Sequence, residues 1–307
     1  MRVLLIAGGW SNEREVSLNG AVQIEKALKD MGHEVIFFDL EPDLDALIKL
    51  ARNSDAAMIN LHGCPGEDGT LQALLDDLGV PYQGSGPLGS FLAINKSLTK
   101  QILRNHGLPT PDWVLLPGYG HRIPPGLKYP LVAKPNTGGS SLNMAIVENL
   151  DQLLLYLEQF SSKHQEIILE DYVQGLELTC AVLDQDALPP VLIKPLKGSF
   201  FDYDSKYDPD GATEICPAPV PQKTIRMVQE MALEVHKILG LKHYSRTDFM
   251  MDKEGSVYIL EANTLPGMTL TSLVPRAAMA AGLDFTDLVG KLLSLALDPG
   301  KRTRRRI

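Results

Sequence analysis

Short apolar runs alternate with amphipathic segments along the first 80 residues of the chain. The apolar runs predict strands at 2–7, 34–38 and 56–61, and the amphipathic segments predict helices after Gly9 and at 44–52 and 70–78. Strands that alternate with helices through short loops favour a doubly wound parallel sheet. The polar loops 8–13 and 62–69 follow the first and third strands. We therefore expect them at the carboxyl ends of the strands, where ligands bind in such sheets.

From about residue 87 the pattern changes to a mixture of helices and strands without regular alternation. We expect helices at 95–105, 151–160 and 222–239, strands at 131–134, 166–170, 177–183 and 191–194, a hairpin at 245–263 and a last helical region. The fold class is therefore α/β in the N-terminal part and α+β in the rest.

Composition and charge argue against several classes of function. The chain has 307 residues, enough for two or three domains, and a formal net charge of −9. Five basic residues lie in the tail 301–307, so the rest of the chain is more acidic still and argues against nucleic acid as the main partner. We expect no membrane span, because no apolar run is long enough. Three widely spaced cysteines argue for a reducing cytoplasm.

The hairpin at 245–263 carries the most informative polar residues. If residues 254–255 form a two-residue turn, Asp248 faces Glu261 and Arg246 faces Asn263. Two opposed carboxylates repel unless a cation lies between them, and oxygen ligands with room for water and phosphate suit Mg²⁺. The alternative is a solvated strand face, but the flanking run 257–260 is apolar and reads as buried.

Phosphate chemistry also needs cationic side chains. Lys134 ends an apolar strand and precedes a loop rich in glycine and serine, whose N–H groups are suited to a phosphate. Taken alone, Lys134 is better interpreted as an ordinary lysine at a strand end before a flexible loop, and Lys96, near a helix start, as a solvated residue. Residues 90–97 lack the glycines of a P-loop, and Gly8-Gly9 lacks the third glycine of a dinucleotide fingerprint.

Taken together and in order, these segments resemble the D-alanine–D-alanine ligases of the ATP-grasp superfamily. The residues that carry the resemblance extend over the chain up to the basic tail. They are Asn12 to Ser17, Leu61-His62-Gly63, Gly66 to Leu71, Gly84-Ser85-Gly86, Asn95-Lys96, Lys134-Pro135, Gly139-Ser140-Ser141, Asp202-Tyr203, Lys206-Tyr207, Arg246, Asp248, Leu260 to Asn263, Pro266 to Thr269 and Ser272 to Pro275.

The resemblance implies a Rossmann-like N-terminal domain (1–86) followed by a two-domain ATP-grasp fold, with a central domain (87–173) and a C-terminal domain (174–307) that carries the metal site. It implies a cytoplasmic enzyme that forms D-alanyl phosphate from ATP and D-alanine. A second D-alanine then attacks this intermediate to give D-alanyl-D-alanine, ADP and phosphate, for peptidoglycan precursor synthesis. A homodimer and two Mg²⁺ ions, or Mn²⁺ in their place, are also implied.

The resemblance assigns a role to each candidate site residue. The metal ligands would be Asp248, Glu261 and Asn263. The catalytic set would be Glu13, Ser140, Tyr207, Arg246 and Gly267, with Arg246 and the Gly267 N–H facing the oxyanion. D-Alanine would be contacted by His62, Lys206, Ser272 and Leu273. ATP would be held by Lys96, Lys134, Glu170, Tyr172, Val173 and Glu177.

The sequence departs from the family pattern at several places. Gly138 stands where many members have glutamate, Leu142-Asn143 replaces a pair of small residues, Cys64-Pro65 replaces a glycine-containing pair, and Asp171 replaces a lysine beside the adenine. Tyr207 favours D-alanine over D-lactate as acceptor. Two alternatives stay open: an ATP-grasp ligase for another carboxylate and amine, and a nucleotide-binding module without catalysis.

Overall fold

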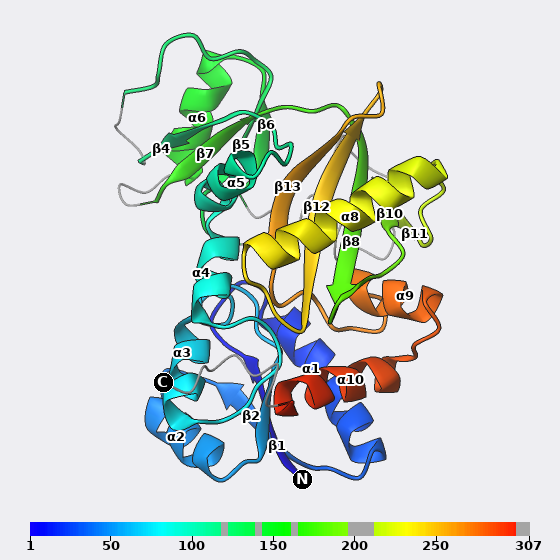
Figure 1. Ribbon diagram of the computed structural model, residues 1–307. Helices are drawn as coiled ribbons and strands as arrows, with labels where there is room; N and C mark the ends of the chain where they lie inside the picture. The colour runs from blue at the N-terminus through cyan, green and yellow to red at the C-terminus, as the bar shows by residue number, and fades with distance from the viewer. Residues whose placement is uncertain (118–121, 139–142, 161–164, 196–211, 299–307) are drawn as a thin grey trace.

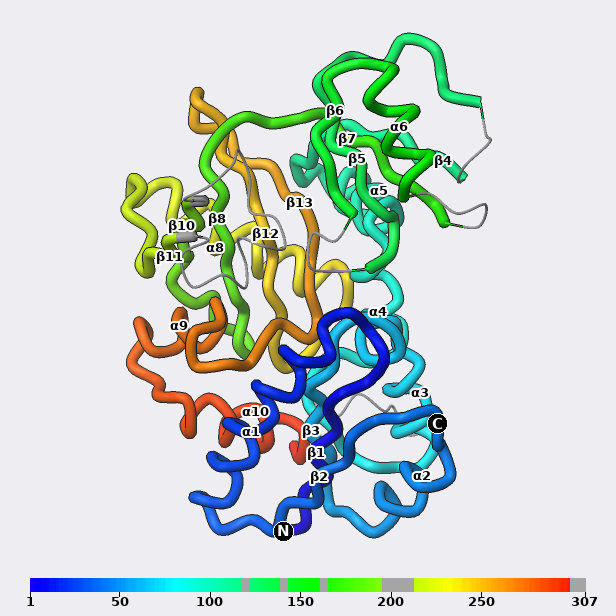
Figure 2. Tube along the Cα trace, turned by 180° about the vertical axis from the view of Figure 1, so that it is seen from behind, coloured from blue at the N-terminus to red at the C-terminus, as the bar shows by residue number. Residues whose placement is uncertain are grey.

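The computed structural model describes residues 1–117, 122–138, 143–160, 165–195 and 212–298 (Figure 1). Within these ranges the strands form three sheets, stacked along the long axis of the molecule (Figures 1 and 2). Each sheet has helices packed against it. The predicted mixture of α/β and α+β structure is therefore confirmed. The proposed domain boundaries remain a prediction.

The N-terminal sheet is parallel, as its sequence pattern predicts. Its strand order is β2-β1-β3, with β1 Arg2–Gly8, β2 Glu34–Leu40 and β3 Ala56–Ile59. Helices α2 (Leu44–Arg52) and α3 (Thr70–Leu78) lie on one side of it, and α1 (Arg14–Asp30) lies on the other beside α10 (Phe285–Leu297) (Figures 1 and 2). Buried residues of α10 belong to the same core as β1, so the chain's last described helix stabilises the first sheet.

Two helices lead out of this sheet toward the middle of the molecule. They are α4 (Pro87–Ile94) and α5 (Lys96–Asn105). The sequence pattern missed α4, although Pro87 at its first position is a favoured helix start. The side chain of Asn95 caps α5 by accepting a hydrogen bond from the Leu98 N–H. Lys96 therefore occupies the first position of a capped helix.

The second sheet along the chain, called the middle sheet for its place in the sequence, is antiparallel, in the order β4-β7-β5-β6. Its bounds are β4 Trp113–Leu116, β5 Leu131–Pro135, β6 Ala145–Val147 and β7 Ile167–Asp171, and α6 (Leu150–Phe160) packs on it. The sequence predicted β5, α6 and β7. Strands β4 and β6 were missed because each has only three or four residues, too few to show a period.

The third sheet holds the predicted hairpin. Its order is β11-β10-β8-β12-β13, with β9 paired to β8. The bounds are β8 Gly175–Leu183, β9 Asp186–Ala187, β10 Val191–Pro195, β11 Ala212–Ile215, β12 Tyr244–Asp252 and β13 Val257–Asn263. Helix α8 (Gln222–Ile238) covers one face and shares its core with α4 and α5 (Figure 1). The other face of the sheet carries the candidate site described below. Helix α9 (Leu273–Ala280) follows β13 at the end nearer the first sheet (Figure 1).

Two further expectations concern the whole chain. Among the described helices, none has the length and apolar character that crossing a bilayer demands. All three cysteines are free thiols, as their spacing suggested. The basic tail and the loop that contains Ser140 lie outside the described residues, and so do Lys206 and Tyr207.

Candidate active site

The hairpin β12–β13 brings the predicted metal ligands together. Asp248 is the register partner of Glu261, and Arg246 is that of Asn263. The predicted two-residue turn is wrong, however. The Gly255 N–H donates to the Asp252 carbonyl and the Asp252 N–H to that of Ser256, so three residues form the loop. The register is corrected by a β-bulge between Asp248 and Phe249, which restores the predicted pairing at the site.

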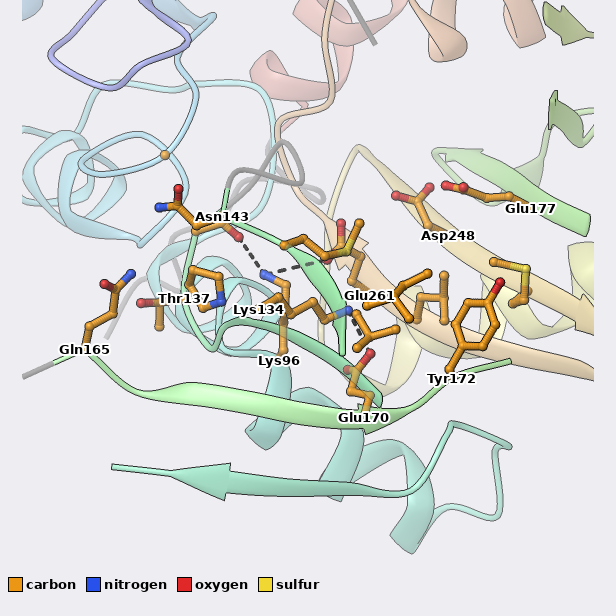
Figure 3. A pocket seen from close by; sticks show the side chains of 18 of the residues that line it. Lys96, Lys134, Thr137, Asn143, Gln165, Glu170, Tyr172, Glu177, Asp248 and Glu261 are labelled. Atoms are coloured by element: carbon orange, nitrogen blue, oxygen red, sulfur yellow. Dashed lines mark hydrogen bonds and ion pairs between the residues drawn. The ribbon is translucent and has the colours of Figure 1, made fainter. Parts of the chain in front are cut away.

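A cavity of about 370 Å³ lies between the middle sheet and this hairpin (Figure 3). The loop after β1 (residues 8–13, called the glycine loop) contributes residues 10–13 to its edge. The structure brings many of the predicted residues to its wall: Glu13, Lys96, Lys134, Glu170, Tyr172, Val173, Glu177, Asp248 and Glu261. Apolar side chains line it as well, among them Val132, Met250 and Leu260. Acidic, basic and apolar groups thus share one space large enough for a nucleotide.

Six other predicted residues within the described ranges are absent from the lining of this cavity: His62, Arg246, Asn263, Gly267, Ser272 and Leu273. Asn263 borders a smaller hollow with Lys96, Glu67 and Glu261. Gly267 lies against Ser272, because a Cβ added to the glycine would sit 2.9 Å from the Ser272 hydroxyl oxygen. Ser272 is the N-cap residue of α9, and Leu273 is its first residue.

The two predicted lysines face different carboxylates. Lys96 Nζ donates to the Gly138 carbonyl at 2.6 Å and lies 3.6 Å from Glu261 Oε2 (Figure 3). Burial lowers the pKa of Lys96, and the carboxylate of Glu261 opposes that shift. Lys134 Nζ lies 2.9 Å from Glu170 Oε2. Burial also disfavours its charge, but the carboxylate of Glu170 prevails and raises the pKa of Lys134. At neutral pH Lys134 therefore carries a positive charge in the cavity wall.

Asp248 is held in place by two neighbours. Arg246 donates from Nε to Oδ1 at 2.8 Å and from Nη2 to Oδ2 at 2.7 Å, and the Thr179 hydroxyl donates to Oδ1 at 2.6 Å. A two-point contact of this kind fixes the plane of the carboxylate. Asp248 is consequently oriented before any ligand arrives.

The donor set of this hairpin fits a hard divalent cation. Asp248 and Glu261 offer carboxylate oxygens from adjacent strands, and the Asn263 amide oxygen follows two residues later. The Asn263 amide oxygen accepts from the Leu265 N–H at 2.9 Å, which fixes its orientation. In the described part of the chain no group of three His, Cys, Asp or Glu side chains gathers, so the hairpin offers two carboxylates and an amide. Mg²⁺ prefers oxygen ligands of this kind and keeps other positions for phosphate and water.

Three ionisable side chains gather where the first sheet meets the cavity. Glu13 and His62 are buried, and so is Glu67, whose Oε2 accepts from the Gly63 N–H at 2.6 Å. Burial raises the pKa of Glu67 to about 7, and the charge of Glu13 adds to the shift. Burial lowers the pKa of His62, against the attraction of Glu13. His62 Nε2 has no hydrogen-bond partner among the described residues, so this buried atom is suited to bind a ligand.

The glycine loop that leads to Glu13 is fixed by an ion pair. Arg14 contacts both carboxylate oxygens of Asp39, at 2.7 and 2.6 Å, and donates to the Gly9 carbonyl at 3.1 Å. Gly8 has a φ of +81° and lies so close to this pair that a Cβ would sit 2.0 Å from Asp39 Oδ1. The loop therefore needs glycine at this position.

Comparison with known proteins places these features in a family. The family model described as "D-ala D-ala ligase C-terminus" matches residues 102–294. D-Alanine–D-alanine ligase of Nitratidesulfovibrio vulgaris (strain DP4) is 54% identical over 303 residues, which cover 98% of this chain and 100% of that protein. The chain belongs to the D-alanine–D-alanine ligase family. The resemblance on which the site residues were predicted is thus confirmed at the level of the family.

Solved structures of this ligase family have the same fold. The crystal structure of D-alanine–D-alanine ligase from Bacillus anthracis has a TM-score of 0.87 at 37% identity, covering 97% of each chain. Its complex with ATP has a TM-score of 0.85 at 34% identity, with the same coverage. The VanG D-Ala:D-Ser ligase of Enterococcus faecalis, at 27% identity and a TM-score of 0.82, covers 96% of this chain and 99% of its own. The predicted ATP-grasp fold is confirmed.

Sequence reasoning missed two buried charged residues beside the predicted set. Glu67 was noted only as part of a motif, and Lys100 was not considered. A signal for Lys100 existed: it follows Lys96 by four residues, which places the two lysines on one face of α5.

Proposed function

We propose that this cavity binds ATP and joins two D-alanine molecules into D-alanyl-D-alanine, releasing ADP and phosphate, for peptidoglycan precursor synthesis. One observation carries the proposal. Lys96, Lys134, Asp248 and Glu261 come from three separate parts of the chain and line one cavity. An arrangement of cations and carboxylates around one space is what phosphoryl transfer needs, since that reaction depends on positioning and on electrostatic stabilisation.

The nucleotide lies between the middle sheet and the hairpin. The adenosine part is lined by Glu170, Tyr172, Val173 and Glu177, beside the apolar wall that Met250 and Leu260 provide. Lys96 and Lys134 face the phosphates. Asp248, Glu261 and Asn263 would hold two Mg²⁺ ions, or Mn²⁺ in their place. When bound, these ions supply positive charge to the phosphate oxygens.

The first D-alanine is activated by phosphorylation. Glu13 binds the ammonium group of this D-alanine, with His62 nearby. A carboxylate oxygen of the D-alanine forms a bond to the γ-phosphorus of ATP, while the bond from that phosphorus to ADP breaks. Ser140 and Tyr207, outside the described residues, complete this group by hydrogen bonds. Lys96, Lys134 and Arg246 offset the charge on the transferring group, and the products are D-alanyl phosphate and ADP.

The second D-alanine is the nucleophile. Its deprotonated amine attacks the D-alanyl carbonyl carbon, the bond from that carbon to the phosphate oxygen breaks, and the proton lost by the nitrogen leaves with the phosphate as HPO4²⁻. The Gly267 N–H and Arg246 stabilise the oxyanion. Ser272 and Leu273, together with Lys206 outside the described residues, contact the acceptor. Tyr207 favours D-alanine over D-lactate in this position.

A phosphate-release assay with detection of the dipeptide tests the reaction. We expect phosphate release that requires ATP, Mg²⁺ and D-alanine together, with one dipeptide formed per phosphate. Another ATP-grasp ligase would release phosphate faster with a different amino acid. A binding module would bind ATP without turnover. Faster release with D-lactate than with D-alanine near neutral pH would contradict the assignment of the acceptor.

We also propose that the protein is a cytoplasmic homodimer. Its three free thiols fit a reducing compartment, where ATP is available. Light scattering on the protein as it elutes from a size-exclusion column tests the oligomeric state directly. A mass equal to one chain over a range of concentrations would contradict the dimer.

A further inference from the structure

Lys100 is the most deeply buried lysine near the cavity. Its side chain on α5 is 1% exposed, although a lysine is rarely buried without a specific partner. Its Nζ lies 3.1 Å from Glu170 Oε1 and donates to the Thr110 hydroxyl at 2.6 Å. The side chain also lies over the Trp113 ring, with Nζ 5.9 Å from the ring centroid. Lys100 does not line the cavity, so these contacts are with the protein itself.

The carboxylate of Glu170 is shared between two lysines. Oε1 faces Lys100 at 3.1 Å and Oε2 faces Lys134 at 2.9 Å, and the Glu170 side chain is only 2% exposed. Burial disfavours the charge of Glu170, but the two ammonium groups prevail and lower its pKa. Burial lowers the pKa of Lys100 to about 8, against the attraction of Glu170, so Lys100 stays charged at neutral pH.

The charges of this buried trio do not cancel. Two ammonium groups and one carboxylate leave a net charge of one positive unit, and of the two cations only Lys134 reaches the cavity wall. Without the charge of Lys100, Glu170 would pair with Lys134 alone, and the pair would be neutral. Because charge interactions are strong where water is excluded, an approaching phosphate would then meet far less attraction.

We propose that Lys100 is a positioning residue for ATP: it takes up part of the charge of Glu170, so that the trio keeps a net positive charge and the Lys134 ammonium is oriented toward the phosphates. This inference rests on the proposed function, since it requires that Lys134 meets ATP. Glu170 itself lines the cavity, so its carboxylate would hold the two lysines beside the nucleotide.

The test compares Lys100→Met with Lys100→Arg. Methionine matches the length of lysine without its charge, and we expect the Kd for ATP to rise about tenfold, which is about 1.4 kcal/mol. Arginine keeps the charge and should restore most of the affinity. The KM for D-alanine should stay unchanged in both variants, because Lys100 acts only through Lys134. If Lys100 served packing alone, Lys100→Met would lower the unfolding midpoint without raising the Kd for ATP selectively over the KM for D-alanine.

A double variant makes the inference falsifiable even if Lys100→Met is less stable. Lys134→Met removes the lysine through which Lys100 is proposed to act, so adding Lys100→Met to Lys134→Met should raise the Kd for ATP by less than about threefold beyond Lys134→Met alone. A further tenfold rise in the double variant, or wild-type affinity in Lys100→Met, would overturn the proposal.

Arg104→Met is the matched control. Arg104 lies on the same helix and over the same Trp113 ring, 4.1 Å from its centroid, but it pairs with Asp112 and its side chain is 44% exposed. Its removal should leave the Kd for ATP unchanged. Failure of the wild type to form dipeptide would contradict the proposed function, whereas ATP binding in the Lys100 variants tests the positioning role separately.

Discussion

Asp248 and Glu261 face each other across β12 and β13 because β13 contains one extra residue, Leu260, at a β-bulge. On the turn side of the bulge Phe249 pairs with Ile259, and both are buried in the core under α8. On the other side Asp248 pairs with Glu261. Leu260 and Glu261 both line the cavity, so the bulge turns two successive side chains toward the nucleotide.

The first prediction concerns Glu261. Glu261→Gln keeps the size of the side chain and removes the charge that would hold a metal ion. We expect turnover to fall by at least about 100-fold, as for the loss of one preorganised electrostatic group. The unfolding midpoint should change little, because this side chain is partly exposed. Glu254→Gln, in the exposed turn of the same hairpin, is the control and should be as active as the wild type. Normal turnover in Glu261→Gln would refute the metal assignment.

The pairing at the site was predictable although the turn was not. A two-residue turn at residues 254–255 predicts Asp248 opposite Glu261. The three-residue loop shifts the ladder by one position, and the bulge at Leu260 shifts it back. The alternation of polar residues fixed which side chains had to share a face, but nothing local in the sequence marks where a bulge absorbs the mismatch.

Contacts between distant segments were the part that the sequence pattern could not supply. Lys134 was found as a cation at a strand end, but its partner Glu170 lies 36 positions later and was assigned to the nucleotide instead. Lys100 resembles an ordinary helix-surface lysine until β7 is packed against α5. Burial of a charge depends on tertiary packing, and a local pattern of residue types carries no information on it.

A second prediction compares two glycines in the left-handed region. Gly8 and Gly32 have φ values of +81° and +82°, but Gly32 has open space around it whereas a Cβ on Gly8 would overlap Asp39. We expect Gly32→Ala to lower the free energy of unfolding by about 1 kcal/mol, the cost of the backbone conformation alone. Gly8→Ala should cost about 2 kcal/mol more, because the Arg14–Asp39 pair must move.

The Gly8 variant should also affect substrate binding. Arg14 donates to the Gly9 carbonyl, so moving this side chain shifts the loop that leads to Glu13. The KM for the first D-alanine is therefore expected to rise in Gly8→Ala and to stay unchanged in Gly32→Ala. Steady-state kinetics and urea unfolding of both variants check this. Equal behaviour of the two variants would mean that the ion pair does not position the loop.

A third prediction concerns the acceptor side of the site. In Gly267→Ala the new methyl group would press on the Ser272 hydroxyl, 2.9 Å away. That hydroxyl accepts from the Thr269 N–H at 3.1 Å, so its displacement disturbs the turn before α9. We expect the KM for the second D-alanine to rise about tenfold while ATP affinity is unchanged.

The control for Gly267→Ala is another glycine with similar crowding. A Cβ on Gly290 would lie 3.0 Å from Met31 Sδ, again a side-chain atom, but on α10 and away from the cavity. Gly290→Ala should leave both KM values unchanged. An unchanged acceptor KM in Gly267→Ala would show that Ser272 does not contact the second substrate.

The last prediction concerns acid sensitivity and a histidine far from the cavity. His236 on α8 makes a 2.7 Å hydrogen bond between its Nδ1 and the Ser245 hydroxyl. Burial lowers the pKa of His236 to about 4, and the nearby charge of His243 adds to the shift while Asp184 opposes it. In the unfolded chain its pKa returns to the ordinary value near 6.5.

Between pH 6.5 and 4 the unfolded chain therefore binds a proton at His236 that the folded chain does not. The folded state loses stability as the pH falls through this window, and the loss is absent above it. When the pH is lowered from 7 to 4.5, the unfolding free energy of His236→Gln should fall less than that of the wild type, by on the order of 2 kcal/mol. Urea unfolding at both pH values measures this. His106→Gln, at an exposed position, is the control. If the two variants show the same pH dependence, burial of His236 does not contribute to acid sensitivity.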